Sequence, residues 1–224
     1  MVLETTKTDQ AREAVASALS EPGAACITCS FQTEDMVVLD LIREHQPDIP
    51  VLFLETGYHF PAVYHYRDEM TARYGLNLVN VLPKKTVAEQ EAEFGSLYQS
   101  RPDQCCKLRK VQPLFAALED YDVWFTGLRR GQSPTRANLQ VSETFPLPSG
   151  KQLAKISPLW DWSNQDVWTV ARSRNIPLLP LYDAGYTSIG CEPCTALPID
   201  AANARSGRWA GQKLECGIHI AEGR

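Results

Sequence analysis

The sequence lacks a long hydrophobic run, a secretion-type start and an excess of positive charge. No stretch approaches the roughly 18 to 20 consecutive apolar residues that a membrane-spanning helix needs, and residues 1–7 lack the basic start and apolar run of a signal peptide. We therefore expect a cytoplasmic protein with no membrane partner. The net charge of −5 argues against a general nucleic-acid surface, yet it is compatible with a local basic pocket for a small anion.

Internal repeats, low-complexity tracts and linker-like segments are also absent from the sequence. With 224 residues, 44% of them hydrophobic and 22% charged, the chain is long enough to bury a sizeable core. We therefore expect a single domain over residues 1–224. Within it, residues 1–24 should form an N-terminal cover helix, and residues 182–224 a loop-rich C-terminal segment that folds over the active site.

Short apolar runs alternate with amphipathic stretches along the chain. Strands are predicted at residues 25–30, 50–54, 76–82 and 121–127, helices at 8–20, 36–44, 61–74, 89–94, 107–119 and 163–174, and an edge hairpin at 141–147 and 152–157. Pro113 implies a kink in its helix or a start nearer to it. The fold class is α/β, a mostly parallel sheet flanked by helices, whose ligands usually lie beyond the carboxyl ends of the strands.

Two pairs of cysteines, Cys105 with Cys106 and Cys191 with Cys194, offer four thiolates from distant segments. In a reducing cytosol these favour metal binding or catalysis over disulfides. Neighbouring residues serve a single zinc ion poorly because successive side chains diverge, whereas each can reach a different iron of a cubane cluster. A 4Fe-4S cluster is thus the first interpretation, a four-thiolate zinc site the second, and a redox dithiol or buried free thiols the third.

The other three cysteines have different settings. Cys26 and Cys29 are three residues apart on a predicted strand, so they should point to opposite faces of the sheet and pack in the core. Cys216 lies between Glu215 and Gly217, near arginines that favour its thiolate. That setting suits a nucleophile, although an incidental tail cysteine would have the same sequence.

Several polar groups are candidates for an anion site. The turn over residues 30–35 precedes a predicted helix and offers backbone N–H groups and the helix dipole, and residues 55–57 follow the next strand. Arginines able to converge on phosphate or sulfate are Arg129, Arg130, Arg136, Arg205 and Arg208. Taken singly, each of these features is equally compatible with an ordinary cap or surface residue.

In combination and in this order, the motifs resemble the sulfonucleotide reductases. They are Ser30-Phe31-Gln32-Thr33-Glu34-Asp35, Leu54-Glu55-Thr56-Gly57, Cys105-Cys106, Gly127-Leu128-Arg129-Arg130, Cys191-Glu192-Pro193-Cys194 and Glu215-Cys216-Gly217-Ile218-His219. The resemblance runs from about residue 25 to the end and is closest to the iron-sulfur branch, the assimilatory adenylyl sulfate (APS) reductases. It implies an adenine-nucleotide α-hydrolase-like fold with a modified pyrophosphate loop.

The resemblance also implies a reaction. Cys216 would attack the sulfur of APS, AMP would leave, and thioredoxin would release sulfite from the S-sulfocysteine. Cys105, Cys106, Cys191 and Cys194 would hold one 4Fe-4S cluster per subunit of a homo-oligomer. Substrate contacts would come from Ser30, Phe31, Gln32, Thr33, Glu34, Glu55, Thr56, Gly57, Lys110, Gly127, Arg129, Arg136, Arg205, Arg208 and His219.

Two features depart from the pattern of relatives, and three alternatives stay open. Many relatives have Asp where this chain has Glu55, and the loop after Ser30 lacks the paired glycines of ATP-cleaving relatives. Reductases for phosphoadenylyl sulfate (PAPS) share the fold and nucleophile but characteristically lack the four cysteines. An ATP-dependent RNA thiolation enzyme would need a glycine-rich loop, and a redox-sensing metal module would leave Cys216 and the arginines unexplained.

Overall fold

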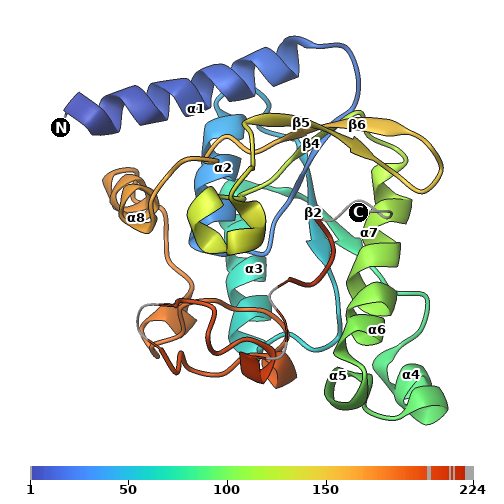
Figure 1. Cartoon of the computed structure of the whole chain (residues 1–224). Helices are drawn as coiled ribbons and strands as arrows, with labels where there is room; N and C mark the ends of the chain where they lie inside the picture. The colour runs from blue at the N-terminus through green and yellow to red at the C-terminus, as the bar shows by residue number, and fades with distance from the viewer. Residues whose placement is uncertain (1, 201–202, 212, 214, 220–224) are drawn as a thin grey trace.

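A six-stranded sheet with the order β3-β2-β1-β4-β6-β5 forms the centre of the computed structural model, which describes residues 2–200, 203–211, 213 and 215–219 (Figure 1). The strands are β1 (Ala25–Thr28), β2 (Pro50–Leu54), β3 (Asn77–Val81), β4 (Val123–Phe125), β5 (Ser142–Pro146) and β6 (Gln152–Ile156). All neighbouring pairs are parallel except β5 and β6, which form the expected antiparallel hairpin at the edge. The predicted α/β class is therefore confirmed.

Eight α-helices of the described chain accompany the sheet. They are α1 (Val2–Ser20), α2 (Thr33–Arg43), α3 (Pro61–Tyr74), α4 (Val87–Phe94), α5 (Leu97–Ser100), α6 (Pro102–Cys106), α7 (Gln112–Leu118) and α8 (Asn164–Ser173). Local chemistry sets several ends: α3 begins at Pro61 and ends before Gly75, and Ser163 forms a capping box with Asp166 at the start of α8. Among the described helices, none has the length and apolar character to cross a bilayer.

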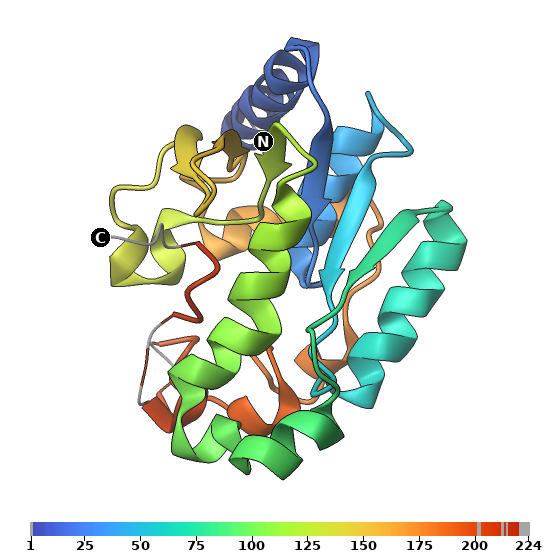
Figure 2. The same cartoon turned by 90° about the vertical axis from the view of Figure 1, so that its right-hand side faces the viewer.

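The two faces of the sheet bury separate cores. One core joins the sheet to α1, α2, α3 and α8, and the other joins it to α7 and the β5–β6 hairpin (Figure 2). Cys29 belongs to the first core and Cys26 to the second. The expectation that these two cysteines point to opposite faces and pack as apolar side chains is confirmed.

The helical segment that carries Cys105 and Cys106 differs from the prediction over residues 107–119. It begins earlier, at Pro102, and continues through a π-helical turn, Lys107–Val111, into α7. Pro113 has no N–H and would clash with the carbonyl four residues back in a regular helix, and a wider turn before it relieves such crowding. The result is a helical segment without interruption from Pro102 to Leu118, in which one turn contains an extra residue.

The strand order changes direction between β1 and β4: β2 and β3 lie on one side of this pair, and β6 and β5 lie on the other. Ligands of open parallel sheets bind beyond the carboxyl ends of the strands at such a switch point. The C-terminal segment crosses this end of the sheet, as the orange and red trace in Figure 1 shows. An isolated bridge between His59 and Cys191 joins it to the end of β2.

Gly127, directly beyond β4, packs against the first turn of α2. A Cβ added there would lie 2.9 Å from the backbone nitrogen of Asp35 and would also clash with its carboxylate. We expect Gly127→Ala to lower the free energy of unfolding by about 2 kcal/mol through overpacking. Urea denaturation followed by circular dichroism measures this change.

The matched control is Gly131→Ala in the same loop. Gly131 has no described atom within 4 Å of its would-be Cβ and no positive φ, so its replacement should shift stability by less than about 0.5 kcal/mol. Equal effects of the two substitutions would show that the close approach at Gly127 does not limit stability.

Candidate active site

A cleft of about 880 Å³ opens at the switch point. Its walls come from the carboxyl ends of β1, β2 and β4, the loop that follows β4, and the C-terminal segment. This volume lies within the range of about 300 to 1,000 Å³ that is usual for small-molecule sites. The place of the cleft is the one that the parallel sheet predicts.

The turn between β1 and α2 is held by its own hydrogen bonds. Asp35 accepts the N–H of Ser30 at 2.7 Å and its hydroxyl at 2.6 Å, and the Phe31 N–H contacts the Cys29 sulfur at 3.4 Å. The Thr33 N–H donates to the Tyr182 hydroxyl, at 3.2 Å. Several donors that the sequence offered to an anion therefore already have acceptors within the protein.

Burial is the main reason why the pKa of Asp35 is raised to about 6. The neighbouring Glu34 raises it further, whereas the two hydrogen bonds from Ser30 favour the ionised form and lower it. A carboxylate that is costly to ionise thus lies at the base of the cleft, where it orders the turn.

The loop after β4 carries two arginines that are paired with carboxylates. Arg129 is 5% exposed and contacts Glu34 at 2.6 Å, while Arg136 contacts Glu215 at 2.7 Å. Gln132 links the pairs, because its amide nitrogen donates to Glu34 at 3.1 Å and its oxygen accepts from Arg136. The loop and the C-terminal segment are thereby joined through one ionic network.

Two basic side chains lie between the cleft and a second, smaller pocket. Lys110 and Arg208 line both spaces, and the Nε of Arg208 donates to the Cys194 carbonyl at 3.4 Å. Burial lowers the pKa of Lys110, but the sulfurs of Cys191, Cys216 and Cys106 outweigh it, so the pKa is above its ordinary value. Lys110 and Arg208 therefore place positive charge between the cleft and the smaller pocket.

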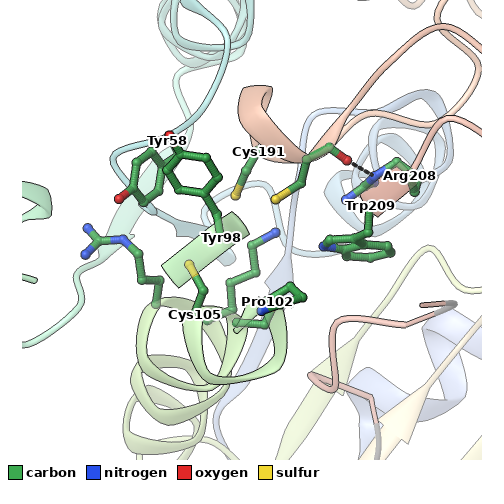
Figure 3. Close-up of a pocket in the computed structure, with 11 residues that line it drawn as sticks. Tyr58, Tyr98, Pro102, Cys105, Cys191, Arg208 and Trp209 are labelled. Carbon is green, nitrogen blue, oxygen red and sulfur yellow. Dashed lines mark hydrogen bonds between the residues drawn. The ribbon is translucent and has the colours of Figure 1, made fainter. Parts of the chain in front are cut away.

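The smaller pocket gathers the four cysteines expected to bind a cluster (Figure 3). Cys105 and Cys106 come from α6, and Cys191 and Cys194 from the C-terminal segment, which is held at this point by the Glu192 N–H bond to the Tyr58 carbonyl, at 2.6 Å. Figure 3 shows the sulfurs of Cys105 and Cys191 facing the same space, with Tyr58 and Tyr98 beside it. The folded chain thus brings the two distant pairs together.

Four sulfurs around one pocket are a donor set that could hold either a single metal ion or a cluster. All four sulfurs are free thiols, and no three His, Cys, Asp or Glu side chains of the described residues converge on one ion. A zinc ion needs its sulfurs gathered at about 2.3 Å from one centre. A cluster accepts a wider arrangement, because each sulfur binds a different iron.

Cys216 and His219 line the cleft from the end of the described chain. His219 stacks on Trp124 with ring centroids 5.3 Å apart, and Ile218 packs against the core beside α7. Burial lowers the pKa of His219 well below its ordinary value, and the cations Lys155 and Arg136 lower it further, so the ring is neutral. Its Nδ1 is buried with no hydrogen-bond partner among the described residues, and a ligand in the cleft would satisfy such an atom.

Comparison with known protein families agrees with this site. The model of the phosphoadenosine phosphosulfate reductase domain matches residues 24–197. The chain belongs to this family. The expected kinship with sulfonucleotide reductases is confirmed, and the match covers the sheet, the cleft loops and all four clustered cysteines.

Individual members of the phosphoadenosine phosphosulfate reductase family are similar over most of their length. The adenosine 5'-phosphosulfate reductase of Streptomyces coelicolor is 45% identical over 87% of this chain and 81% of its own, and that of Geobacillus kaustophilus is 42% identical over 96% and 92%. The crystal structure of a phosphoadenylyl-sulfate (PAPS) reductase from Candida auris superposes with a TM-score of 0.71 at 29% identity, covering 83% of this chain and 90% of that one.

The structure brings together most of the site residues that the sequence predicted for this family. Lining the cleft are Ser30, Gln32, Glu34, Lys110, Gly127, Arg129, Arg136, Arg205, Arg208, Cys216 and His219. Arg130 also lines the cleft, but its Nε donates to the Leu139 carbonyl at 2.7 Å and its guanidinium lies over the ring of Trp160. It takes no part in the ionic network.

The other expected contacts lie away from the cleft. Phe31 and Thr33 are buried in the turn before α2. Glu55 accepts the Tyr64 hydroxyl at 2.6 Å and pairs with Arg67 at 3.4 Å. Thr56 lies beside the cysteine pocket, where its hydroxyl oxygen contacts the Cys191 sulfur at 3.4 Å, and Gly57 follows it. Of this group, Thr56 is thus the residue in direct contact with the cysteine pocket.

Sequence reasoning assigned no role to Asp35, Glu215 or His59. The first two were visible only as members of quoted motifs, since pairing with Ser30 or Arg136 has no local signature. His59 lines the cleft, and burial lowers its pKa to about 4, so it is a neutral ring that bonds the Leu54 carbonyl at 2.8 Å. Its position in the loop that follows β2 was the available signal.

The raised pKa of Asp35 predicts a pH-dependent stability. The carboxyl has a pKa of about 6 in the folded protein against 3.8 as its ordinary value, so the folded state binds the proton more tightly. Relative to Asp35→Asn, the wild-type free energy of unfolding should therefore fall by about 2 kcal/mol as pH rises from about 4 to 6, and then level off. Urea denaturation of both proteins at half-unit pH intervals tests this, and a constant or widening advantage of the wild type would contradict it.

Proposed function

We propose that this chain reduces adenosine 5'-phosphosulfate (APS) to sulfite and AMP, with Cys216 as the nucleophile. The observation that carries the proposal is the position of a cysteine in a nucleotide-sized cleft that is also lined by Arg136, Arg205 and Arg208. Guanidinium groups bind phosphate and sulfate oxygens through paired hydrogen bonds. The relatives from Streptomyces coelicolor and Geobacillus kaustophilus, both named as APS reductases, support the same reaction.

In the first step, the Cys216 thiolate attacks the sulfur of APS. A sulfur–sulfur bond forms, the bond between that sulfur and the phosphate oxygen breaks, and AMP leaves with the electron pair. Arg136, Arg205 and Arg208 hold the phosphosulfate and stabilise the charge that develops on the leaving phosphate. His219 is neutral, and its Nδ1, which has no partner among the described residues, forms a hydrogen bond with the bound substrate or with a water beside it.

In the second step, a dithiol protein of the thioredoxin class supplies two electrons. One of its thiolates attacks the Cys216 sulfur, and sulfite leaves with the electron pair of the sulfur–sulfur bond. The second thiol of the donor resolves the mixed disulfide and regenerates the Cys216 thiolate. Of the described cysteines, the other six are buried or lie around the smaller pocket, so Cys216 is the one positioned to be reached by both substrate and donor.

Cys105, Cys106, Cys191 and Cys194 would hold a 4Fe-4S cluster beside the cleft. When bound, the cluster supplies a local electrostatic field for the substrate and does not carry the transferred electrons. Lys110 and Arg208 line both pockets, so their positive charges lie between the cluster site and the anion in the cleft. The four cysteines also favour APS over PAPS as substrate, although the similarity to the Candida auris PAPS reductase keeps PAPS as the second candidate.

The S-sulfocysteine intermediate provides the test. Anaerobically purified protein incubated with APS, without reductant, should gain the mass of one sulfonate, and reduced thioredoxin should remove it. Cys216→Ser should gain nothing, because its hydroxyl is a far weaker nucleophile at neutral pH. Intact mass spectrometry follows each species.

Incubation with PAPS is the parallel arm of the experiment. A sulfonate adduct that forms with PAPS and not with APS would support Cys216 as the nucleophile and identify PAPS as the substrate. No adduct with either nucleotide, in protein that contains its metal, would rule out the sulfonucleotide reductase reaction for this chain.

The cluster assignment predicts a selective loss of iron. Cys194→Ser should reduce bound iron and acid-labile sulfide severalfold, because it removes one of four ligands, whereas Cys26→Ala, in the core beside Trp124, should retain both. Metal analysis and the visible absorption of anaerobic samples measure the effect independently of activity. Equal iron contents in the two variants would exclude Cys194 as a ligand.

A further inference from the structure

Glu215, the residue before Cys216, occupies the anion-binding edge of Arg136. Its two carboxylate oxygens accept from the Nε of Arg136 at 3.0 Å and from its Nη2 at 2.7 Å. The hydroxyl of Thr135 donates to the same carboxylate at 3.0 Å, and Arg205 lies 4.0 Å from it. This is the paired geometry in which a guanidinium binds a phosphate or sulfate.

The ion pair is largely shielded from water. The side chains of Glu215 and Arg136 are only 10% and 12% exposed, and that of Arg205 is 19% exposed. Burial raises the pKa of Glu215, but the bonds to Arg136 and the charge of Arg205 lower it below its ordinary value. The carboxylate is therefore ionised at neutral pH and matches the charge of the anions that the arginines are suited to bind.

An incoming anion cannot use the same edge of Arg136 while Glu215 is there. The Nε and Nη2 atoms both donate to Glu215, and Nη1 donates to Gln132. Three of the five N–H groups of Arg136 are thereby used, and the edge formed by Nε and Nη2 is fully taken, so a substrate anion gains a paired contact with that edge only by replacing Glu215.

Among the described residues, the carboxylates that pair with arginines of the cleft are Glu34 and Glu215, and Glu215 is the one that lies outside regular secondary structure. Glu34, which pairs with Arg129, belongs to the first turn of α2 and is fixed by that helix. Glu215 lies in the C-terminal segment, which has no helix or strand over residues 215–219. Separating Glu215 from Arg136 therefore breaks no helix or strand.

We propose that Glu215 is a positioning residue that occupies the site of the substrate's terminal anionic group and is displaced by it. This inference rests on the proposed function and adds a competition between the protein's own carboxylate and the substrate. Because Glu215 is bonded to Cys216 through the chain, displacement also moves the nucleophile's segment. Binding of the anion and repositioning of Cys216 then become one event.

When the protein's own carboxylate competes for the site, the ligand binds only the fraction of molecules in which the site is free. The apparent dissociation constant is then the intrinsic one divided by that fraction. Glu215→Gln keeps the size of the side chain and removes its charge. We expect it to tighten binding of ADP on the order of tenfold. ADP is the probe because its terminal phosphate replaces the sulfate of APS, and it contains no sulfur for Cys216 to attack. Isothermal titration calorimetry at low salt measures the dissociation constant.

Alkylation of Cys216 provides a second readout. Without ligand, iodoacetamide should modify Cys216 faster in Glu215→Gln than in the wild type, because the variant loses the contact that holds the segment. At saturating ADP the two rates should converge, since ADP displaces Glu215 in the wild type and the variant already lacks its ion pair with Arg136. A purely structural role of Glu215 would leave the difference in place. The Cys216 peptide is quantified by mass spectrometry, so the other cysteines do not interfere.

Glu143→Gln is the matched control, because it removes the same charge from a residue that pairs with Lys155, at 3.9 Å, and has no arginine partner among the described residues. Its ADP affinity should stay within about twofold of the wild type. A wild type that reduces APS and binds ADP, with Glu215→Gln binding no more tightly, would overturn this inference alone. A wild type that neither reduces APS nor binds ADP would overturn the proposed function and this inference with it.

Discussion

The concentration of positive charge in one partly buried cleft is the constraint on which the rest of the site depends. Lys110, Arg129, Arg136, Arg205 and Arg208 line the same space, and burying such charges without partners would cost several kcal/mol each. The fold compensates for them with Glu34, Glu215 and the cysteine sulfurs. Each compensating group comes from a different part of the chain, so the charges of the cleft also hold the loop after β4 and the C-terminal segment against the sheet.

The sheet provides the fixed side of this arrangement and the C-terminal segment the adjustable side. Strands β1 and β4 are almost completely buried, and the close approach of Gly127 to Asp35 sets the loop beyond β4 against α2. The helical segment from α6 to α7 presents Cys105 and Cys106, and Lys110 within its π-helical turn, toward the pockets. Only short 3₁₀ turns and isolated bridges order the described residues after 190, and their place depends on contacts with the rest of the chain.

Sequence reasoning was most successful where the physical signal is local. Alternation of apolar runs located all six strands, Pro61 and Gly75 marked the ends of α3, and the spacing of Cys26 and Cys29 showed that they face opposite cores. It was less successful where partners are distant in the chain. Glu215 and Arg136 are 79 residues apart, and nothing in either segment specifies the other. Glu55, which its position after β2 suggested as a ligand contact, pairs in the structure with Tyr64 and Arg67 of the following helix, α3.

The way in which the segment around Cys216 is held has a chemical consequence. In the reaction proposed above, Cys216 meets first a nucleotide and then a protein dithiol, and a segment held by exchangeable contacts suits two reactants that approach in turn. Ion pairs meet this requirement better than apolar packing, since an anionic ligand can replace a carboxylate directly. In this chain the segment has both kinds of contact. His219 and Ile218 pack on Trp124 and the core beside α7, whereas Glu215 lies against Arg136. Cys216 lies between the two, so its position follows from the balance between a fixed apolar anchor and a replaceable ionic one.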